Sequence, residues 1–125
     1  MKKIINTINA PAPIGPYNQA VLLNGVLYTS GQIAIHPATN ELVIDEIKKE
    51  TKMVMENLKS VLAAADMTME DVVKTTIFIS DMNNFATINE VYGSYFTSNF
   101  PARETVEVAC LPKNVNVEIS AIASK

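Results

Sequence analysis

Two ionisable residues in the last quarter of the chain are the strongest candidates for chemistry. Arg103 is the only arginine, and Glu118 lies in the middle of an otherwise apolar run. The guanidinium group is a permanent cation whose fork of N–H donors matches a carboxylate, and a glutamate can accept a proton from water. The two residues therefore indicate a small site in which Arg103 holds an anionic substrate and Glu118 handles a water molecule or a proton.

A purely structural explanation accounts for the same two residues. A charge inside a strand is costly unless it is solvated, paired or used, so the side chains could form an ion pair or face solvent on an open sheet surface. Residue chemistry alone favours this structural explanation. The residues around Arg103 and Glu118 are therefore needed to choose between the structural and the functional explanation.

The pair belongs to two predicted strands, over residues 104–111 and 115–123, which Pro112-Lys113-Asn114 joins. We expect these strands to be neighbours in a C-terminal hairpin. Arg103, at the start of the first strand, would then lie near Glu118 on the second.

Hydrophobic periodicity and turn residues predict the elements upstream. Asn24-Gly25 lies between two apolar runs and is a strong hairpin signal, because both central residues need a positive φ. Gly31 lies inside the second run, where a glycine suggests a bulge or the close approach of a ligand or another backbone. In chain order we expect a short edge strand over 3–6, a rigid proline-rich segment over 10–16, strands over 19–23 and 26–35, a helix over 46–65, a strand over 72–80 and a helix over 84–96.

This order predicts a single α+β domain over residues 1–125, with both helices on one face of a mixed sheet of about six strands. The succession of strand, helix and strand predicts parallel pairing through a right-handed crossover. We expect Asp45 to cap the first helix and Asp81 or Asn83 to cap the second. Neither face of the strand over 72–80 is cleanly polar, so we expect its free face to be buried against other subunits in a closed ring.

Composition restricts the function. The net charge of −3 and the pI near 5.1 argue against nucleic acid and anionic membranes as partners. A lone cysteine, Cys110, excludes an intramolecular disulfide and fits a reducing compartment; we expect it to be a small core hydrophobe. With no signal peptide or membrane span in the sequence, we expect a cytoplasmic protein.

Several site chemistries lack the residues that they need. One histidine and one cysteine, without suitably spaced carboxylates, do not favour a zinc or redox site. No glycine-rich phosphate loop is present, and Ser30 lacks a histidine partner for a nucleophilic triad.

Four polar stretches in a fixed order carry a more specific signal, and with them the sequence closely resembles the Rid family, the reactive intermediate deaminases. The resemblance covers essentially the whole chain. The stretches are APAPIGPYNQA (10–20), TSGQIAIHP (29–37), KTTIFISDMNNFATINEVYGSYF (74–96) and FPARETVEVACLPKNVNVEI (100–119).

The resemblance implies a fold and an activity. Rid proteins are homotrimers with a chorismate-mutase-like fold, in which three sheets form a barrel-like core and the substrate clefts lie between subunits. The archetypal members hydrolyse 2-imino and enamine acids to 2-keto acids and ammonia, and these substrates leak from pyridoxal-phosphate-dependent dehydratases. No metal or organic cofactor is implied, since imines are already electrophilic and positioning with proton handling suffices.

The resemblance also implies site residues. The arginine of the family falls on Arg103, which would hold the substrate carboxylate with help from the backbone N–H of Gly31. The glutamate of the family falls on Glu118, which would orient or activate the attacking water. Other pocket-lining positions fall on Tyr17, Ser30, Thr105, Phe85 and Asn89.

This chain departs from the family pattern at four positions. Thr105 stands where many relatives have cysteine, so a role that needs a thiol is lost. Cys110 replaces a frequent arginine, Ser120 a common glutamate and Pro13 a common alanine. These departures leave the substrate preference open.

Two other functions remain as alternatives. One is a regulatory trimer that binds a small carboxylic acid without turnover. The other is an RNA-cleaving or translation-inhibiting protein, an activity attributed to some relatives. The acidic pI and the single arginine argue against the second alternative.

Overall fold

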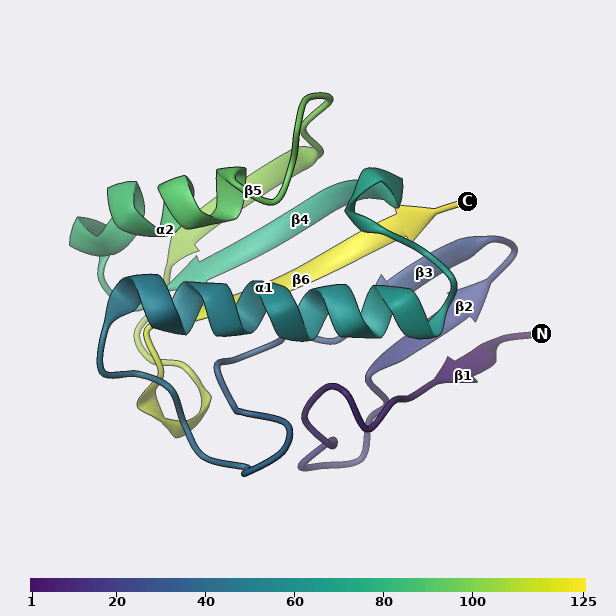
Figure 1. Ribbon diagram of the computed structural model, residues 1–125, viewed down its shortest axis with the longest axis horizontal. Helices are drawn as coiled ribbons and strands as arrows, with labels where there is room; N and C mark the ends of the chain where they lie inside the picture. Colours follow the sequence, from purple (N-terminus) through teal and green to yellow (C-terminus); the bar gives the residue numbers. More distant parts are fainter.

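The computed structural model describes all residues from 1 to 125 as one mixed six-stranded sheet with two helices on one face (Figure 1). The sheet order is β1-β2-β3-β6-β4-β5. The strands are β1 (Lys3–Ile5), β2 (Ala20–Leu23), β3 (Val26–Thr29), β4 (Val72–Ile79), β5 (Ala102–Glu107) and β6 (Val117–Ser124), and the helices are α1 (Ile47–Ala64) and α2 (Phe85–Gly93). The predicted α+β class is confirmed.

The predicted N-terminal hairpin is confirmed. Strands β2 and β3 pair antiparallel, with Leu23 opposite Val26. The two residues between them have positive φ, 51° at Asn24 and 78° at Gly25, as a two-residue hairpin turn requires. The second strand is shorter than expected, because it ends at Thr29.

The predicted C-terminal hairpin is wrong. Strand β4 lies between β5 and β6, pairing parallel with β5 and antiparallel with β6. The connection through α2 brings β5 in beside β4 as a parallel neighbour, and the chain then crosses to the other side of β4 before β6 begins. Residues 108–116 therefore span a strand and do not form a tight turn.

Strand β6 also separates β3 from β4. Both strands pair antiparallel with β6, so β3 and β4 run in the same direction without touching. The expected direct pairing across α1 is therefore wrong, whereas β4, α2 and β5 do form a parallel pair with a helical crossover.

Both helices begin close to the expected residues, with different caps. Glu46 occupies the N-cap position of α1 and its side chain makes no capping hydrogen bond, so the assignment of Asp45 is wrong. Asp81 accepts a hydrogen bond from the backbone N–H of Asn83 at 2.9 Å, which caps a single 3-10 turn (Met82–Asn84) leading into α2. Helix α2 ends at Gly93, three residues before the expected end.

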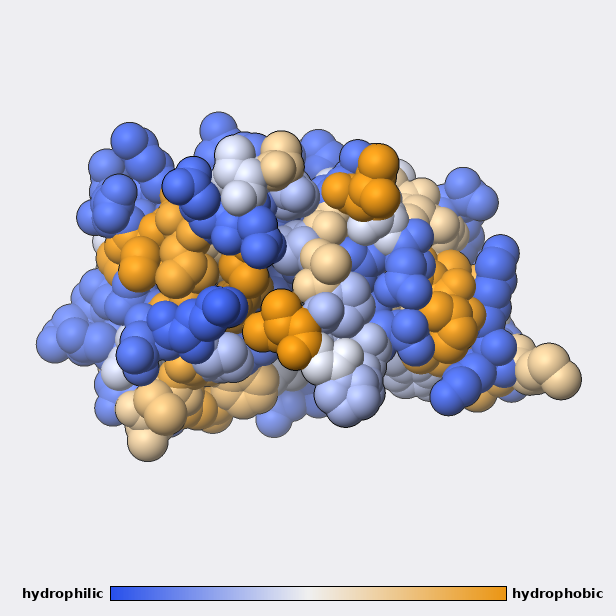
Figure 2. All heavy atoms as spheres, turned by 90° about the horizontal axis from the view of Figure 1, so that it is seen from below, coloured by the Kyte–Doolittle hydropathy of each residue, from blue (hydrophilic) through white to orange (hydrophobic).

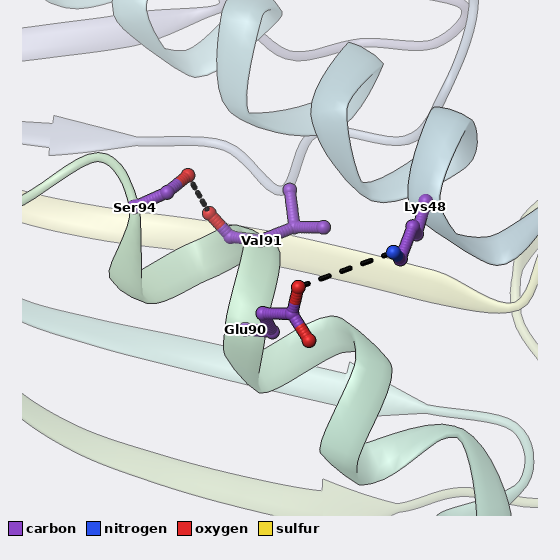
Figure 3. Close-up of polar contacts among 4 residues, drawn as sticks. All are labelled: Lys48, Glu90, Val91 and Ser94. Atoms are coloured by element: carbon purple, nitrogen blue, oxygen red, sulfur yellow. Dashed lines mark hydrogen bonds and ion pairs between the residues drawn. The ribbon is translucent and has the colours of Figure 1, made fainter.

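The main core lies between the helices and the sheet. Helix α1 contributes a fully buried stripe to it, and the two helices lie side by side, joined at the surface by an ion pair between Lys48 Nζ and Glu90 at 3.9 Å (Figure 3). The side chain of Ser94 ends α2 by donating to the Val91 carbonyl at 2.6 Å (Figure 3). The buried residues of the α1 stripe are Val54, Leu58, Val61 and Leu62.

The sheet face opposite the helices carries several apolar side chains. Register places Tyr28 beside Ile122, and Phe78 beside Val106 and Glu118, on this open face. Tyr28 is 48 % exposed and Val106 is 43 % exposed. Along the edge seen in Figure 2, hydrophobic atoms gather in separate patches among hydrophilic ones.

Cys110 is exposed, so its assignment to the core is wrong. Strand β5 ends at Glu107, and the alternation that the sequence suggests does not continue beyond it. Neither helix is both long enough and apolar enough to cross a membrane.

Candidate active site

Arg103 lies on the helix side of the sheet, held by one face of α2. It pairs in register with Thr75, which is buried beneath the helices. Its Nη1 donates to Asn89 Oδ1 at 2.6 Å, and its guanidinium carbon lies 5.1 Å from the centre of the Tyr92 ring and 5.6 Å from that of Phe85. Residues 85, 89 and 92 recur at the spacing of one helix face, so α2 presents two aromatic rings and one amide to the cation.

An open cavity of about 350 Å³ adjoins the guanidinium group. Apart from the bond to Asn89, the guanidinium N–H groups of Arg103 make no hydrogen bond in the chain. A planar cation with unused parallel donors can bind a carboxylate through two hydrogen bonds. The residues that line the cavity are Asn89, Tyr92, Gly93, Phe100, Pro101 and Arg103.

Thr105 lies two residues further along β5 on the same face. Its register partner is Ile77, which is buried beneath the helices. The hydroxyl oxygen of Thr105 is the one buried side-chain polar atom in the chain without a hydrogen-bond partner. A buried polar group without a partner is costly, and Thr105 is not among the residues that line the cavity beside Arg103.

Glu118 lies on the opposite face of the sheet. Its register partner is Phe78, and its chain neighbours Val117 and Ile119 are buried on the helix side. Its carboxylate makes no hydrogen bond or ion pair in the chain, and burial raises its pKa above the ordinary 4.5. A desolvated carboxylate without a partner holds a proton more tightly than a solvated one.

Gly31 provides the space in which Glu118 lies. A Cβ atom on Gly31 would be 2.8 Å from Cδ and 2.9 Å from Cγ of Glu118, so only glycine leaves this carboxylate in place. The neighbouring residue Gln32 exchanges two backbone hydrogen bonds with Ile119, at 2.8 and 3.1 Å. The backbone N–H of Gly31 itself has no acceptor in the chain and is free to donate to a ligand.

Tyr17 completes the surroundings of Glu118. The two residues line a small cavity of about 60 Å³ together with Gly31. The Tyr17 hydroxyl accepts from the backbone N–H of Ile14 at 3.3 Å, and the ring remains 46 % exposed.

Ser30 does not line this cavity. Its hydroxyl donates to the Asn18 carbonyl at 2.6 Å, and its backbone N–H donates to the Gln19 carbonyl at 2.9 Å. These bonds tie the loop that carries Tyr17 to the segment that carries Gly31. Within the chain, Ser30 therefore positions other residues and does not present its hydroxyl to the cavity.

The predicted site residues thus form two separate groups. The arginine half-site consists of Arg103, Thr105, Asn89 and Phe85, and the glutamate half-site consists of Glu118, Gly31 and Tyr17. They lie on opposite faces of the sheet with β4 between Arg103 and Glu118, so a single chain does not bring them together.

Two residues that support these half-sites are not among the predicted site residues. Tyr92 is not among the site residues that the sequence predicts, yet the guanidinium group lies over its ring. Its position seven residues after Phe85 is the signal that could have indicated this role. Gln19 is buried and makes hydrogen bonds to Thr7, Ala10 and Pro11 that fold the Tyr17 loop; nothing in its spacing indicated that.

Comparison with known proteins identifies the family. Residues 7–125 match the family model described as endoribonuclease L-PSP. A RutC family protein of Pyrococcus horikoshii is 51 % identical over 125 residues, which cover 100 % of this chain and 99 % of the relative. The chain belongs to this family, the RutC or Rid family. The resemblance inferred from the sequence is therefore confirmed.

Other Rid family members agree in sequence and in structure. Human 2-iminobutanoate/2-iminopropanoate deaminase is 45 % identical over 123 residues, covering 98 % of this chain and 90 % of the human protein. The solved structure of a Rid family protein from Yersinia pestis superposes with a TM-score of 0.97 at 50 % identity, covering 100 % of both chains. The structure of Escherichia coli TdcF with bound serine superposes with a TM-score of 0.95 at 44 % identity, covering 98 % of each chain.

Proposed function

We propose that this protein hydrolyses 2-imino acids and their enamine tautomers, such as 2-iminobutanoate and 2-iminopropanoate, to 2-keto acids and ammonia. The reaction takes place in clefts between the subunits of a cytoplasmic homotrimer. Each cleft combines the arginine half-site of one subunit with the glutamate half-site of the next, and the 125 residues act as a single domain.

The observation that carries this proposal is the separation of the two half-sites. Arg103 has unused donors beside an open cavity, and the Glu118 carboxylate and the Gly31 N–H have no partners in the chain. These complementary groups face opposite sides of one sheet, so only another copy of the chain can unite them. The apolar residues of the open face, among them Tyr28 and Val106, supply surface for such an assembly.

The half-sites suit the binding of a 2-imino acid. Its carboxylate accepts hydrogen bonds from the guanidinium group of Arg103 and from the backbone N–H of Gly31. The C=N carbon, one bond away from the carboxylate, then faces Glu118. The fork of Arg103 fixes the plane of the carboxylate, and that fixes the face of the imine that water attacks.

Hydrolysis needs one water molecule, and both of its protons end on the nitrogen. Glu118 accepts a proton as the water oxygen bonds to C2, and the electron pair of the C=N bond moves to nitrogen. Glu118 passes this proton to the nitrogen, which gives a carbinolamine. It then takes up the hydroxyl proton and delivers it to the same nitrogen as the C–N bond breaks and the C2=O bond forms, so that ammonia leaves and Glu118 is ionised again. The raised pKa of Glu118 makes it a stronger base than an ordinary carboxylate, and no cofactor takes part.

The names of relatives support this substrate class. The human and bovine proteins named 2-iminobutanoate/2-iminopropanoate deaminase are 45 % and 47 % identical to this chain. Those imines are products of pyridoxal-phosphate-dependent dehydratases acting on threonine and serine, so we propose a functional link to such enzymes.

The TdcF structure supports a second candidate function. That relative was solved with bound serine, a small amino acid whose carboxylate the arginine half-site would also hold. A regulatory trimer that binds small carboxylic acids without turnover therefore remains the second candidate.

A competition assay separates the two candidates. A threonine dehydratase generates 2-iminobutanoate, semicarbazide traps it, and the rate of semicarbazone formation is followed with and without the protein. The wild-type protein should lower that rate, Arg103→Ala should not, and the surface variant Lys59→Ala should behave as wild type. If the wild-type protein is inert with several imines yet binds the corresponding keto acids, the regulatory function is the better explanation.

A further inference from the structure

A buried carboxylate outside both half-sites has no role in the proposed reaction. Glu50 lies in the first turn of α1 and is completely buried. One of its oxygens accepts from the backbone N–H groups of Asn116 and Val117, at 2.7 and 3.3 Å, and the other accepts from Asn116 Nδ2 at 2.7 Å. Every one of these donors lies at the start of β6, next to Glu118.

Core packing alone does not explain a glutamate at this position. Burying a carboxylate is costly even when it is hydrogen-bonded, and an apolar side chain of similar size is often equally stable. The carboxylate differs from an apolar side chain in that it makes directional hydrogen bonds. Its two oxygens fix the position of two consecutive backbone N–H groups and one side-chain amide. The buried carboxylate of Glu50 therefore serves to fix the location of the segment that it bonds, Asn116 and Val117.

Asn116 is also tied to the end of β4. Its carbonyl accepts from the backbone N–H of Ser80 at 3.1 Å, and its Oδ1 accepts from the Ser80 hydroxyl at 3.4 Å. The residue two positions before Glu118 is therefore fixed from the helix layer by Glu50 and from within the sheet by Ser80. In Figure 1 this junction lies where β6 begins beneath the first turn of α1.

The same helix holds the segment that carries Gly31. Asn57, which is buried, donates from Nδ2 to the carbonyls of Ile33 and Ile35, at 3.2 and 2.9 Å. Residues 50 and 57 are seven apart and so lie on one face of α1. Two buried polar groups on that face thus fix the two segments that meet where Gly31 lies against Glu118.

We propose that Glu50 is a positioning residue for Glu118, which it holds over Gly31 by fixing the start of β6. This inference rests on the proposed function, since it assigns Glu50 a part in the same reaction. Glu50 touches neither cavity and binds no substrate. Its loss should therefore slow turnover while leaving intact the arginine half-site, which holds the substrate carboxylate.

Two substitutions of similar size test the proposal. Glu50→Leu fills the same space without accepting a hydrogen bond. Glu50→Gln keeps an oxygen for the two backbone N–H groups, and its amide can donate to Asn116 Oδ1 once the Asn116 amide turns over. For 2-iminobutanoate we expect kcat to fall about 10- to 100-fold in Glu50→Leu with KM changed less than about threefold, and Glu50→Gln to stay within about threefold of wild type in both.

The outcomes separate positioning from a structural role. Thermal unfolding and trimer content are measured for each variant, since a loss of structure would change kcat and KM together. A Glu50→Leu variant that is folded and keeps the wild-type kcat overturns the proposal, as does Glu50→Gln failing as badly as Glu50→Leu. Should Glu50→Leu not fold, Asn116→Ala decides, because it retains the backbone bonds to Glu50 and should lower kcat about 3- to 10-fold with KM unchanged; an unchanged kcat there overturns the proposal.

Failure of the proposed function has a different signature. If the wild-type protein hydrolyses no imine, the proposed function and the role of Glu50 in it fail together. If the wild-type protein is active and the folded variants keep its kcat, only the assignment of Glu50 fails.

Discussion

At the scale of single residues, the Glu118 carboxyl group should set the acid limb of the pH profile. Burial raises its pKa above 4.5, so it remains protonated at pH values where an ordinary glutamate is ionised. The base in the proposed reaction is the ionised form, and activity is therefore lost as pH falls through the raised pKa. We expect the midpoint of the acid limb in kcat/KM for 2-iminobutanoate to lie above 4.5 and the limb to be absent from the residual activity of Glu118→Gln.

The stability of the same variant provides the control. A carboxyl group whose pKa is raised by folding favours the folded state at low pH, and this contribution is lost as pH rises through the folded pKa. At neutral pH the desolvated Glu118 carboxylate is therefore unfavourable, and Glu118→Gln should unfold at the same or a higher temperature than wild type. A variant that is inactive because it is unfolded would show the opposite shift.

Gly31 is the second residue whose substitution has a defined result. A Cβ atom there would displace the Glu118 side chain, with Cδ only 2.8 Å away. We expect Gly31→Ala to lower kcat/KM about 10- to 100-fold, which corresponds to about 1.4–2.7 kcal/mol in the activation free energy. Steady-state kinetics with 2-iminobutanoate measures the loss.

A double substitution shows whether this loss acts through Glu118. If it does, adding Gly31→Ala to Glu118→Gln should cost little more than Glu118→Gln alone, because the displaced group no longer functions. Additive losses would mean that Gly31 acts mainly through its backbone N–H or through the fold of its own segment.

At the scale of whole elements, α2 acts as the support of Arg103. Its face carries Phe85, Asn89 and Tyr92 against the guanidinium group, with a hydrogen bond of 2.6 Å to Asn89. Asn89→Ala removes the only hydrogen-bond acceptor and lets the cation leave its alignment with the substrate. Since substrate binding depends on that alignment, we expect KM to rise about 3- to 10-fold with a smaller change in kcat, as measured on purified trimers.

A neighbouring substitution on α2 gives the matched control. Glu90 is exposed and its side chain pairs only with Lys48 at 3.9 Å. Surface ion pairs of this kind contribute about 0–1 kcal/mol to stability, so Glu90→Ala should leave both kinetic constants unchanged. A rise in KM for both variants would point to a loosened helix instead of a released arginine.

The sequence predicts which elements form better than it predicts how they are arranged. The hairpin at Asn24-Gly25 and the first helix follow from local patterns, and the structure confirms both. The insertion of β6 between β3 and β4 does not follow from any local pattern. Strand order depends on which distant segments bury each other's apolar faces. The spacing of residues within one segment does not determine which other segment becomes its neighbour.

The same distinction applies to the candidate site. Arg103 and Glu118 could be selected from their residue types and settings, but their placement on opposite faces depends on β4 lying between their strands. Thr105 could be named from the family pattern, whereas its buried hydroxyl without a partner is visible only in three dimensions. The prediction that Cys110 is a core residue is wrong because it assumes that the strand continues to residue 111. Strand β5 ends at Glu107, and Cys110 is exposed.

At the scale of the whole molecule, the proposal requires each site to draw Arg103 and Glu118 from different subunits. Arg103→Ala and Glu118→Gln trimers should each keep only a small residual activity alone, because the first lacks the carboxylate-binding cation and the second lacks the base. In a closed ring of three, every trimer that contains both kinds of subunit has one site with an intact arginine half-site facing an intact glutamate half-site. Random mixing puts three quarters of the trimers in this class, so co-expression of the two variants should restore about a quarter of wild-type activity.

Separate affinity tags on the two variants allow the mixed trimers to be purified and assayed. A mixture of two separately purified variants, combined without exchange of subunits, is the control and should remain inactive. If the site lay within one chain, the mixed trimers would be as inactive as their parents, because each chain would still lack one of the two residues. Restored activity therefore shows that each active site forms between two subunits and not within one. The proposal that the two separated half-sites work together depends on this result.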